Sequence, residues 1–339
     1  MREKAAVCLY SGGLDSILAI KLMLDQGFTI TALKLVTPFF YERSDPVWVL
    51  EQEGVTIHHL DITNEFLDML GSPQYGYGKN LNPCLDCKIL MLKRAKNVMH
   101  KIGARFVFTG EVVGQRPMSQ MKNNLRMLEK KSGLDGFLLR PLSAQLLPLT
   151  IMEQEGLIDR AKLLGINGRS RKMQIVMAME LGLVDYPTPA GGCRLTDPQF
   201  CRRLRLLLDG RKRLDRFDIE LLTIGRHFLL PRGEKESLKR VVVGRNKEEN
   251  AKLLSIASSM HIIMKSTDFP GPTGILVGTF SNDDLKAAAS IIARYTDKGG
   301  RDIITIQIHP SGGAPSVGQC IESIQVPALS EDRLVSMRI

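Results

Sequence analysis

The sequence predicts an α/β protein in which a doubly wound parallel sheet is followed by a second, smaller α+β domain. β-type and helical segments alternate from residue 5 to about residue 190, the pattern of a parallel sheet covered on both faces. The composition then becomes arginine-rich, and a different set of strand-like and helical segments follows. We therefore expect a first domain over residues 1–200, a basic linker over 201–216 and a second domain over 217–339.

The elements expected in the first domain follow one another in regular alternation. The strand-like segments are Ala5–Tyr10, Thr29–Val36, Val55–Asp61 and Phe106–Thr109, and the helical segments are Ile17–Gln26, Val47–Glu53, Leu85–Ile102 and Gly156–Leu164. Ligands of such sheets bind at the carboxyl ends of the strands. The turns after these strands should therefore lie together, which brings Gly110 and Glu111 close to the turn after Tyr10.

The second domain has its own alternation of elements. Its expected strands are Val241–Val243, Ile262–Lys265, Gly274–Gly278, Ile303–Ile308 and Cys320–Val326, and its expected helices are Glu248–Ser259 and Asn282–Thr296. No internal repeat is present.

The composition restricts the classes of function. A chain of 339 residues that is 44% hydrophobic can bury a full core. No apolar run approaches the roughly 18 residues of a membrane span, and Met1–Lys4 leads into a strand rather than a signal peptide. We therefore expect a soluble, cytoplasmic protein without membrane partners. The net charge of +10 favours a polyanionic partner, whereas the single Trp and six Tyr argue against base stacking as its main binding mode.

The turn between the first strand and the first helix has the chemistry of an anion site. It reads Ser11, Gly12, Gly13, Leu14, Asp15, Ser16. Glycines let the backbone approach a phosphate, and the N–H groups and dipole of the following helix favour its charge. The serine hydroxyls add donors, and Asp15 can hold a magnesium ion that bridges phosphates. The turn lacks the ending of the Walker loop and the spacing of the dinucleotide fingerprint; a glycine-rich turn that binds nothing is the alternative.

Three of the six cysteines form a pattern. Cys84 and Cys87 are spaced as CxxC, and Cys193 follows two glycines in a distant loop. Together they provide three thiolates, and one iron of a [4Fe–4S] cluster on them would remain open to another ligand. A zinc half-site and a metal-free redox dithiol are the alternatives. Cys8, Cys201 and Cys320 have no informative spacing.

The turn and the cysteines together resemble a known family. Ser11–Ser16 matches the SGGxDS motif of the ATP pyrophosphatases, the PP-loop family, and Asn82–Cys87 resembles the NPCxxC stretch of tRNA-specific 2-thiouridylases. Residues 109–126 resemble the TGExxGQxxSQxxxNL block of tRNA 4-thiouridine synthetases, and Leu139–Leu142 continues this likeness. The resemblance covers roughly residues 5–195 and indicates a PP-loop tRNA sulfurtransferase with the adenine nucleotide alpha hydrolase-like fold.

The resemblance implies a reaction and a set of site residues. ATP would bind with Mg²⁺, and the residues implied to contact it are Tyr10, Ser11, Gly12, Gly13, Asp15, Ser16, Lys34, Leu35, Gly110 and Gln120. A tRNA uridine oxygen would be adenylated with loss of pyrophosphate, and sulfur would then replace it, with Asp15, Cys84 and Cys193 as catalytic residues. We expect a [4Fe–4S] cluster on Cys84, Cys87 and Cys193 to carry the sulfur. In cluster-free relatives a persulfide, here on Cys193 and attacked by Cys84, does so.

The implied partners are tRNA and a sulfur donor. The donor would be a cysteine desulfurase, sulfide or a carrier protein, and a homodimer is compatible with the sequence. The second domain resembles the NFACT RNA-binding domain through Val243–Asn250 and Asp268–Thr273. An αβ dimerisation or capping module is the alternative for that domain. For the whole chain, the alternatives are a PP-loop adenylating enzyme with another substrate and an RNA- or ribosome-binding adaptor.

Overall fold

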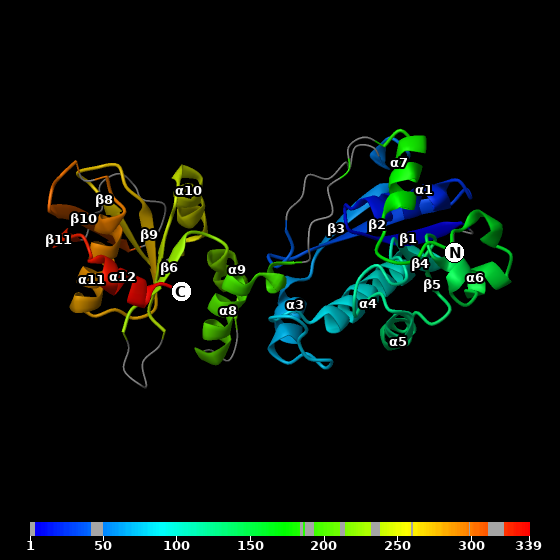
Figure 1. Cartoon of the computed structure of the whole chain (residues 1–339), viewed down its shortest axis with the longest axis horizontal. Helices are drawn as coiled ribbons and strands as arrows, with labels where there is room; N and C mark the ends of the chain where they lie inside the picture. The colour runs from blue at the N-terminus through cyan, green and yellow to red at the C-terminus, as the bar shows by residue number, and fades with distance from the viewer. Residues whose placement is uncertain are drawn as a thin grey trace. The chain divides into compact units, whose positions relative to one another are not determined.

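A parallel sheet forms the centre of the N-terminal part of the protein in the computed structural model (Figure 1). The structure describes residues 4–41, 50–183, 186, 193–210, 214–231, 238–258, 260–297, 299–310 and 322–339. The chain divides into two compact units, Met1–Thr196 and Asp197–Ile339, which are treated separately below.

The sheet of the first unit has five strands in the order β3-β2-β1-β4-β5. The strands are β1 (Ala5–Tyr10), β2 (Thr29–Val36), β3 (Thr56–Asp61), β4 (Phe106–Thr109) and β5 (Leu138–Leu139), and all their pairings are parallel. Every residue of β1 is buried, as expected for a central strand that is covered on both faces.

Helices cover both faces of this sheet. They are α1 (Leu14–Leu24), α3 (Thr63–Gly71), α4 (Cys84–Ile102), α5 (Lys122–Ser132), α6 (Ile151–Gln154) and α7 (Lys172–Glu180). Figure 1 shows α1 and α7 together on one side of the sheet and α4 on the other, with α5 packed on α4. The doubly wound parallel sheet predicted from the sequence is thereby confirmed.

The glycines after two of these helices explain where the helices end. Gly103 and Gly133 follow α4 and α5 in the left-handed conformation, with φ of 70° and 69°. Their N–H groups bond the last carbonyl groups of the helix, as in a common C-terminal cap.

One helix expected in this unit is absent from the described residues. Gly156–Leu164 was expected to be helical, but it contains only the 3₁₀ turn Arg160–Lys162. The expectation is wrong because Gly156, with φ of 72°, ends the short helix α6, and Asp159 then caps a single turn by accepting a bond from the Ala161 N–H. The expected helix Val47–Glu53 lies partly outside the described residues.

The second unit is built on a six-stranded sheet in the order β11-β10-β8-β9-β7-β6, and all its pairings are antiparallel. The strands are β6 (Arg226–Leu229), β7 (Arg240–Val243), β8 (Ile262–Ser266), β9 (Thr273–Val277), β10 (Ile303–Pro310) and β11 (Glu322–Pro327). β6 is a strand that the sequence pattern did not predict.

Helices pack on both faces of the second sheet as well. They are α8 (Pro198–Gly210), α9 (Arg216–Leu222), α10 (Lys247–Ile256), α11 (Asn282–Arg294) and α12 (Glu331–Met337). α11 shares one apolar cluster with β8 and β10, whereas α9 and α10 share another with β7 and β9. Asn246 caps α10, and Ser281 with Asp284 forms a capping box at α11.

Residues 201–216, expected to be a basic linker, include most of helix α8 and lie in the second unit. Phe200, Leu204 and Leu207 recur every three or four residues along this helix, and all three are buried. The arginines therefore occupy the other positions of an amphipathic helix. None of the helices among the described residues is long and apolar enough to cross a membrane.

Candidate active site

The phosphate loop, Ser11–Ser16, forms a tight turn between β1 and α1. Gly12 has φ of 74°, a conformation that residues with a side chain rarely adopt. Gly13 begins α1 without a side-chain cap, and the Ser16 hydroxyl donates to the Gly13 carbonyl over 2.7 Å. The Ser16 N–H bonds the Gly13 carbonyl over 3.0 Å, which leaves the N–H groups of Leu14 and Asp15 at the start of α1 to meet an anion, whose charge the helix dipole favours.

Gly110, directly after β4, lies against this loop. A Cβ atom at Gly110 would come within 2.4 Å of the carbonyl carbon and oxygen of Asp15 and 2.5 Å of the Ser16 nitrogen. Real Cβ contacts are never that short, and backbone atoms cannot move aside as a flexible side chain can. The close approach of β4 to the phosphate loop therefore requires glycine at this position.

The Asp15 carboxylate is held by residues from two other segments. Gln115 donates from Nε2 to Asp15 Oδ2 over 2.8 Å, and an Arg171 NH2 nitrogen lies 3.7 Å from Asp15 Oδ1. Gln174 of α7 donates to Gln115 over 3.4 Å. Buried atoms without a hydrogen-bond partner surround this point: Asp15 Oδ1, Arg171 Nε and Gln174 Oε1. A buried carboxylate oxygen without a hydrogen-bond partner can serve as a ligand of Mg²⁺, because Mg²⁺ prefers oxygen ligands of this kind.

The residues expected near the adenine differ in how far their side chains are exposed. Tyr10 is 2% exposed and belongs to the apolar core, and Leu35 is buried as well. Tyr10 pairs with Lys34 across β1 and β2, and the Lys34 side chain is half-buried. Gln120 is buried, its Oε1 atom has no partner, and its carbonyl accepts from the Gly114 N–H over 2.8 Å. At Tyr10 and Leu35, backbone groups are thus better placed than side chains to meet a base.

Cys84 and Cys87 occupy the first turn of α4. The Cys84 thiol donates to Asn82 Oδ1 over 3.1 Å, and Cys87 lies 3.7 Å from the Met91 sulfur. Asp86, between them, accepts from the N–H groups of Gln74 and Tyr75 and thereby fixes the preceding loop. The CxxC spacing therefore places both thiols at the N-terminus of one helix.

Cys193 lies close enough to Cys87 to affect the ionisation of that thiol. Burial raises the pKa of Cys87 to about 12; the charge of Lys88 opposes this, whereas Cys193 and Cys84 add to it. Burial also raises the pKa of Cys84, against the Asn82 hydrogen bond and the charges of Lys88 and Arg116. The structure therefore brings the three predicted cysteines into one neighbourhood, with cations beside them.

The segment after Cys193 is tied to the loops at the carboxyl edge of the sheet. The Asn80 side chain donates to the Thr196 carbonyl over 2.9 Å. Arg194 donates from its backbone to the Phe39 carbonyl and from Nε to the Pro38 carbonyl, directly beyond β2. These contacts explain how a loop more than a hundred residues downstream of Cys84 reaches the same region.

A buried ion-pair network links the cysteines to the phosphate loop. Lys88, one residue after Cys87, lies 3.2 Å from Glu111 Oε1, and Glu111 follows Gly110. Arg140 donates to Glu111 over 3.2 Å and also pairs with Glu129. Burial alone would raise the pKa of Glu111, but Lys88 and Arg140 outweigh it and hold that pKa below its usual value. Glu111 is therefore an anion that fixes Lys88 between the two parts of the site.

The thiols of the cysteines and the side chains around them do not form a metal site in this structure. No group of three or more His, Cys, Asp or Glu side chains within the described part of the chain lies close enough to hold a metal ion. The thiols of Cys84 and Cys87 instead contact neighbouring side chains. The residues present thus do not fit a preformed [4Fe–4S] cluster, and the chemistry proposed below uses the thiols themselves.

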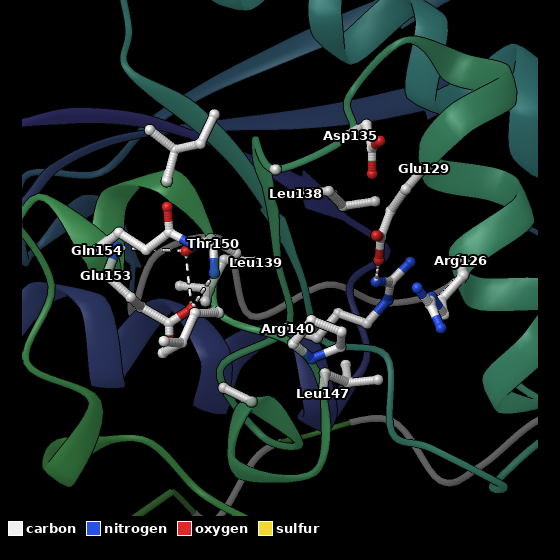
Figure 2. Close-up of a pocket in the computed structure, with 15 residues that line it drawn as sticks. Arg126, Glu129, Asp135, Leu138, Leu139, Arg140, Leu147, Thr150, Glu153 and Gln154 are labelled. Atoms are coloured by element: carbon white, nitrogen blue, oxygen red, sulfur yellow. Dashed lines mark hydrogen bonds and ion pairs between the residues drawn. The ribbon is translucent and has the colours of Figure 1, made fainter.

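A cavity of about 320 Å³ lies elsewhere in the first unit (Figure 2). None of the residues predicted to bind ATP lines it. Of its carboxylates, Glu129 pairs with Arg140, and Glu153 pairs with Arg160 and accepts from the Thr150 N–H; Asp135 is the third. The cavity therefore lies behind the ion-pair network rather than at the phosphate loop.

Sequence reasoning missed several residues of this site. Lys88, Arg171 and Gln174 lie in or next to helices, and no motif includes them. Gln115 and Glu111 were part of the quoted TGExxGQ stretch but were not assigned as site residues. The spacing of Glu111 two residues after a strand was a usable signal, whereas the contribution of α7 depends on tertiary packing.

Known proteins resemble both units. A family model described as thiamine biosynthesis protein (ThiI) matches residues 2–179, and a model of the NFACT protein RNA binding domain matches residues 225–336. A search of curated proteins finds no match.

Solved structures give weaker likenesses. A 4-thiouridine synthetase–RNA complex with bound ATP has a TM-score of 0.37 and 19% identity, covering 53% of this chain and 41% of that chain. The C-terminal part of the fibronectin/fibrinogen-binding protein from Streptococcus suis has a TM-score of 0.28 and 12% identity, over 81% and 85% of the two chains. NMN synthetase from Francisella tularensis has a TM-score of 0.30 and 16% identity, over 56% and 90%. All three TM-scores are low, so these likenesses say nothing about activity.

The match to the ThiI family model assigns the chain to a family. It spans more than half of the 339 residues and includes the phosphate loop, both CxxC cysteines and Glu111. The chain therefore belongs to the ThiI family of PP-loop enzymes, which use ATP to modify tRNA, and it also carries an NFACT-type RNA-binding domain.

Proposed function

We propose that this protein is an ATP-dependent tRNA uridine sulfurtransferase. It adenylates a uridine carbonyl oxygen with release of pyrophosphate and then replaces that oxygen with sulfur delivered by its cysteines. The supporting observation is the ion pair between Lys88 and Glu111. It joins the turn that holds Cys84 and Cys87 to the segment that packs on the phosphate loop, so that activation and sulfur delivery share one edge of the sheet.

The first step is adenylation. The N–H groups at the start of α1 bind the phosphates of ATP, and magnesium, when bound, neutralises part of their charge. Asp15 is the residue that would hold this ion, and Gln115 and Arg171 keep its carboxylate in place. The uridine oxygen attacks the α-phosphorus, the bond to the β-phosphate breaks, and pyrophosphate leaves. The ring carbon then carries AMP, a good leaving group.

The second step is sulfur transfer. A cysteine desulfurase or a persulfidated carrier protein places a sulfur atom on Cys193. The terminal sulfur attacks the activated ring carbon, and AMP leaves with the electron pair of the carbon–oxygen bond. The Cys84 thiolate then attacks the Cys193 sulfur; a Cys84–Cys193 disulfide forms, and the electron pair of the broken S–S bond stays on the thiolated base. An external dithiol reduces the disulfide for the next cycle.

The position of Cys84 suits this role. Burial raises the pKa of its thiol above the ordinary value, and the Asn82 hydrogen bond and the charges of Lys88 and Arg116 offset part of that rise. Cys84 is also the first residue of α4, where the helix dipole favours a thiolate. Because the proposed substrate is tRNA, the reaction would take place in the cytoplasm.

The decisive experiment measures thiolated nucleosides directly. Purified protein is incubated with unmodified tRNA, ATP and a persulfide donor, and the tRNA is digested and analysed by mass spectrometry. We expect one thiouridine per tRNA, formed together with AMP and pyrophosphate. ATP consumption that depends on tRNA without any thiolated nucleoside would contradict the proposal.

Three cysteine variants separate the sulfur-transfer schemes. Thiol chemistry predicts that Cys84→Ala and Cys193→Ala abolish thiolation while pyrophosphate release continues, and that Cys87→Ala is tolerated. A cluster predicts instead that all three variants lose thiolation together with bound iron. Iron and sulfide analysis of anaerobically purified protein therefore decides between the two schemes. Full activity of iron-free protein would exclude the cluster.

A further inference from the structure

Five arginines gather at one end of β6 and β7 in the second unit, and we propose that they bind phosphate groups of the RNA backbone. This arginine cluster consists of Arg203, Arg226 and Arg245, which bond main-chain oxygens there, and of Arg202 and Arg338, the sequence neighbours of Arg203 and of its partner Ile339. Two of its members come from α8, which precedes the residues that match the RNA-binding family model. The choice of tRNA as the ligand rests on the proposed function.

Arg203 is fixed at the centre of the cluster by backbone carbonyls. Its Nε donates to a main-chain oxygen of Ile339, the last residue of the chain, over 3.2 Å, and one terminal nitrogen donates to the Leu222 carbonyl over 3.4 Å. Ile339 in turn donates to the His227 carbonyl over 3.1 Å. The half-buried guanidinium therefore joins α8, α9, β6 and the segment after α12.

Arg226 and Arg245 are fixed in the same way on the adjoining strands. Arg245 donates to the Gly225 carbonyl over 2.9 Å, and Arg226 donates to the Gly244 carbonyl over 3.3 Å. A Cβ atom at Gly225 would come within 2.6 Å of the Val243 carbonyl oxygen, so the ends of β6 and β7 approach closely. The Arg226 guanidinium also lies over the Tyr295 ring, 4.5 Å from its centroid, which fixes it further at this end of the sheet.

Acidic partners do not balance the cluster. Burial lowers the pKa of Arg203, Arg245 lowers it further, Asp197 opposes this, and Arg338 and Arg202 lower it again. The carboxylate of Glu249, 3.4 Å from Arg245, offsets part of the positive charge as well. His227 is 1% exposed, and burial together with Arg203 and Arg240 lowers its pKa to about 3, so it stays neutral.

A phosphate group would supply the negative charge that this arrangement of arginines lacks. In Arg203, Arg226 and Arg245, main-chain oxygens use only some of the guanidinium N–H donors and hold the others in fixed directions, which suits bidentate contacts to phosphate oxygens. Arg202, Arg245 and Arg338 are exposed and accessible to a large ligand. A nucleic-acid backbone offers many phosphates and needs no aromatic side chains for its recognition.

The test measures binding of fluorescently labelled tRNA to the full chain as salt is raised. Each lost phosphate contact should lower the slope of log affinity against log salt by roughly 0.7–0.9. We expect this reduction, with a several-fold weaker affinity, for Arg202→Gln and for Arg338→Gln, and about twice the reduction for the double variant. Thermal unfolding checks that each variant remains folded, which is expected because both side chains are exposed.

Arg294→Gln is the matched control. It removes one positive charge from α11 in the same unit, where Arg294 is exposed and lies 2.7 Å from Glu331. The control should bind tRNA with the wild-type slope. Equal slopes for the wild type, the control and the cluster variants would overturn the inference. Cluster variants that lose affinity as expected, in a protein that forms no thiouridine, would leave the inference standing and contradict the proposed function.

Discussion

The two regions that we assign to phosphate groups solve the same problem with different parts of the polypeptide. The phosphate loop uses glycines, an uncapped helix and one carboxylate, whereas the arginine cluster uses guanidinium groups fixed on carbonyls. Backbone N–H groups hold one phosphate group in one pose, as a reaction at the α-phosphorus requires. Long cationic side chains accept phosphates in several poses, as a backbone-binding surface requires.

This difference predicts how each region responds to substitution. In the phosphate loop a change of one atom should affect chemistry strongly, because geometry is what the loop provides. In the arginine cluster a change of one charge should affect affinity moderately, because its members act additively on a distributed ligand.

The largest effect is expected for Asp15→Asn. This change keeps the volume of the side chain and an oxygen for the Gln115 hydrogen bond, but it removes the charge that would hold magnesium. We expect pyrophosphate release to fall by roughly 10²–10³-fold, as on loss of one preorganised electrostatic contact to a transition state. Stability should change little, because the ion pair of Asp15 with Arg171 is long and partly exposed. Near-normal pyrophosphate release would show that Asp15 has another role.

The next effect is expected for Gly110→Ala. The added methyl group would lie 2.4 Å from the Asp15 backbone, so β4 and α1 must separate. Overpacking of this kind typically costs about 1–3 kcal/mol, and the same displacement should weaken ATP binding. Gly71→Ala is the matched control, since a Cβ there meets nothing within 4 Å and Gly71 ends a helix. Chemical unfolding and ATP titration of both variants should show losses only for Gly110→Ala.

The sequence predicted those parts of the site that depend on local chemistry. Ser11–Ser16 follows a fully buried strand and opens a helix, so its type and place could be read from neighbouring residues. The CxxC spacing likewise indicated two thiols on one helical turn. Both patterns lie within one βα unit or one turn and need no knowledge of distant pairings.

The parts contributed by distant segments could not be predicted in this way. Arg171 reaches Asp15, and Gln174 reaches Gln115, because α7 packs on α1, a contact between distant segments that no periodicity encodes. The order of the antiparallel strands in the second unit is equally nonlocal. The segment 201–216 is a different case. Its buried Leu204 and Leu207 gave a helical signal that the density of arginines obscured.

The smallest effect concerns pH and separates the two units. His227 has a pKa of about 3, below its ordinary value of 6.5, because of burial first and then the neighbouring arginines. Above pH 6.5 the histidine is neutral in both the folded and the unfolded chain, so it does not lower the free energy of unfolding there. As pH falls from 6.5 towards 3, the unfolded chain binds a proton that the folded chain does not, and stability declines by up to about 1.4 kcal/mol per pH unit.

Glu111 in the first unit should respond later to acid. Its pKa is lowered from 4.5, so the stability that it contributes is lost only as pH falls below that value. Between pH 6.5 and 5, the decline should therefore come from the second unit. His227→Gln keeps a donor for the Ile224 carbonyl but does not titrate, so its free energy of unfolding should vary less with pH in this range. His59→Gln, at an exposed position of β3, should follow the wild type. Equal pH dependence of the two variants in chemical unfolding experiments would show that the folded chain does not lower the pKa of His227.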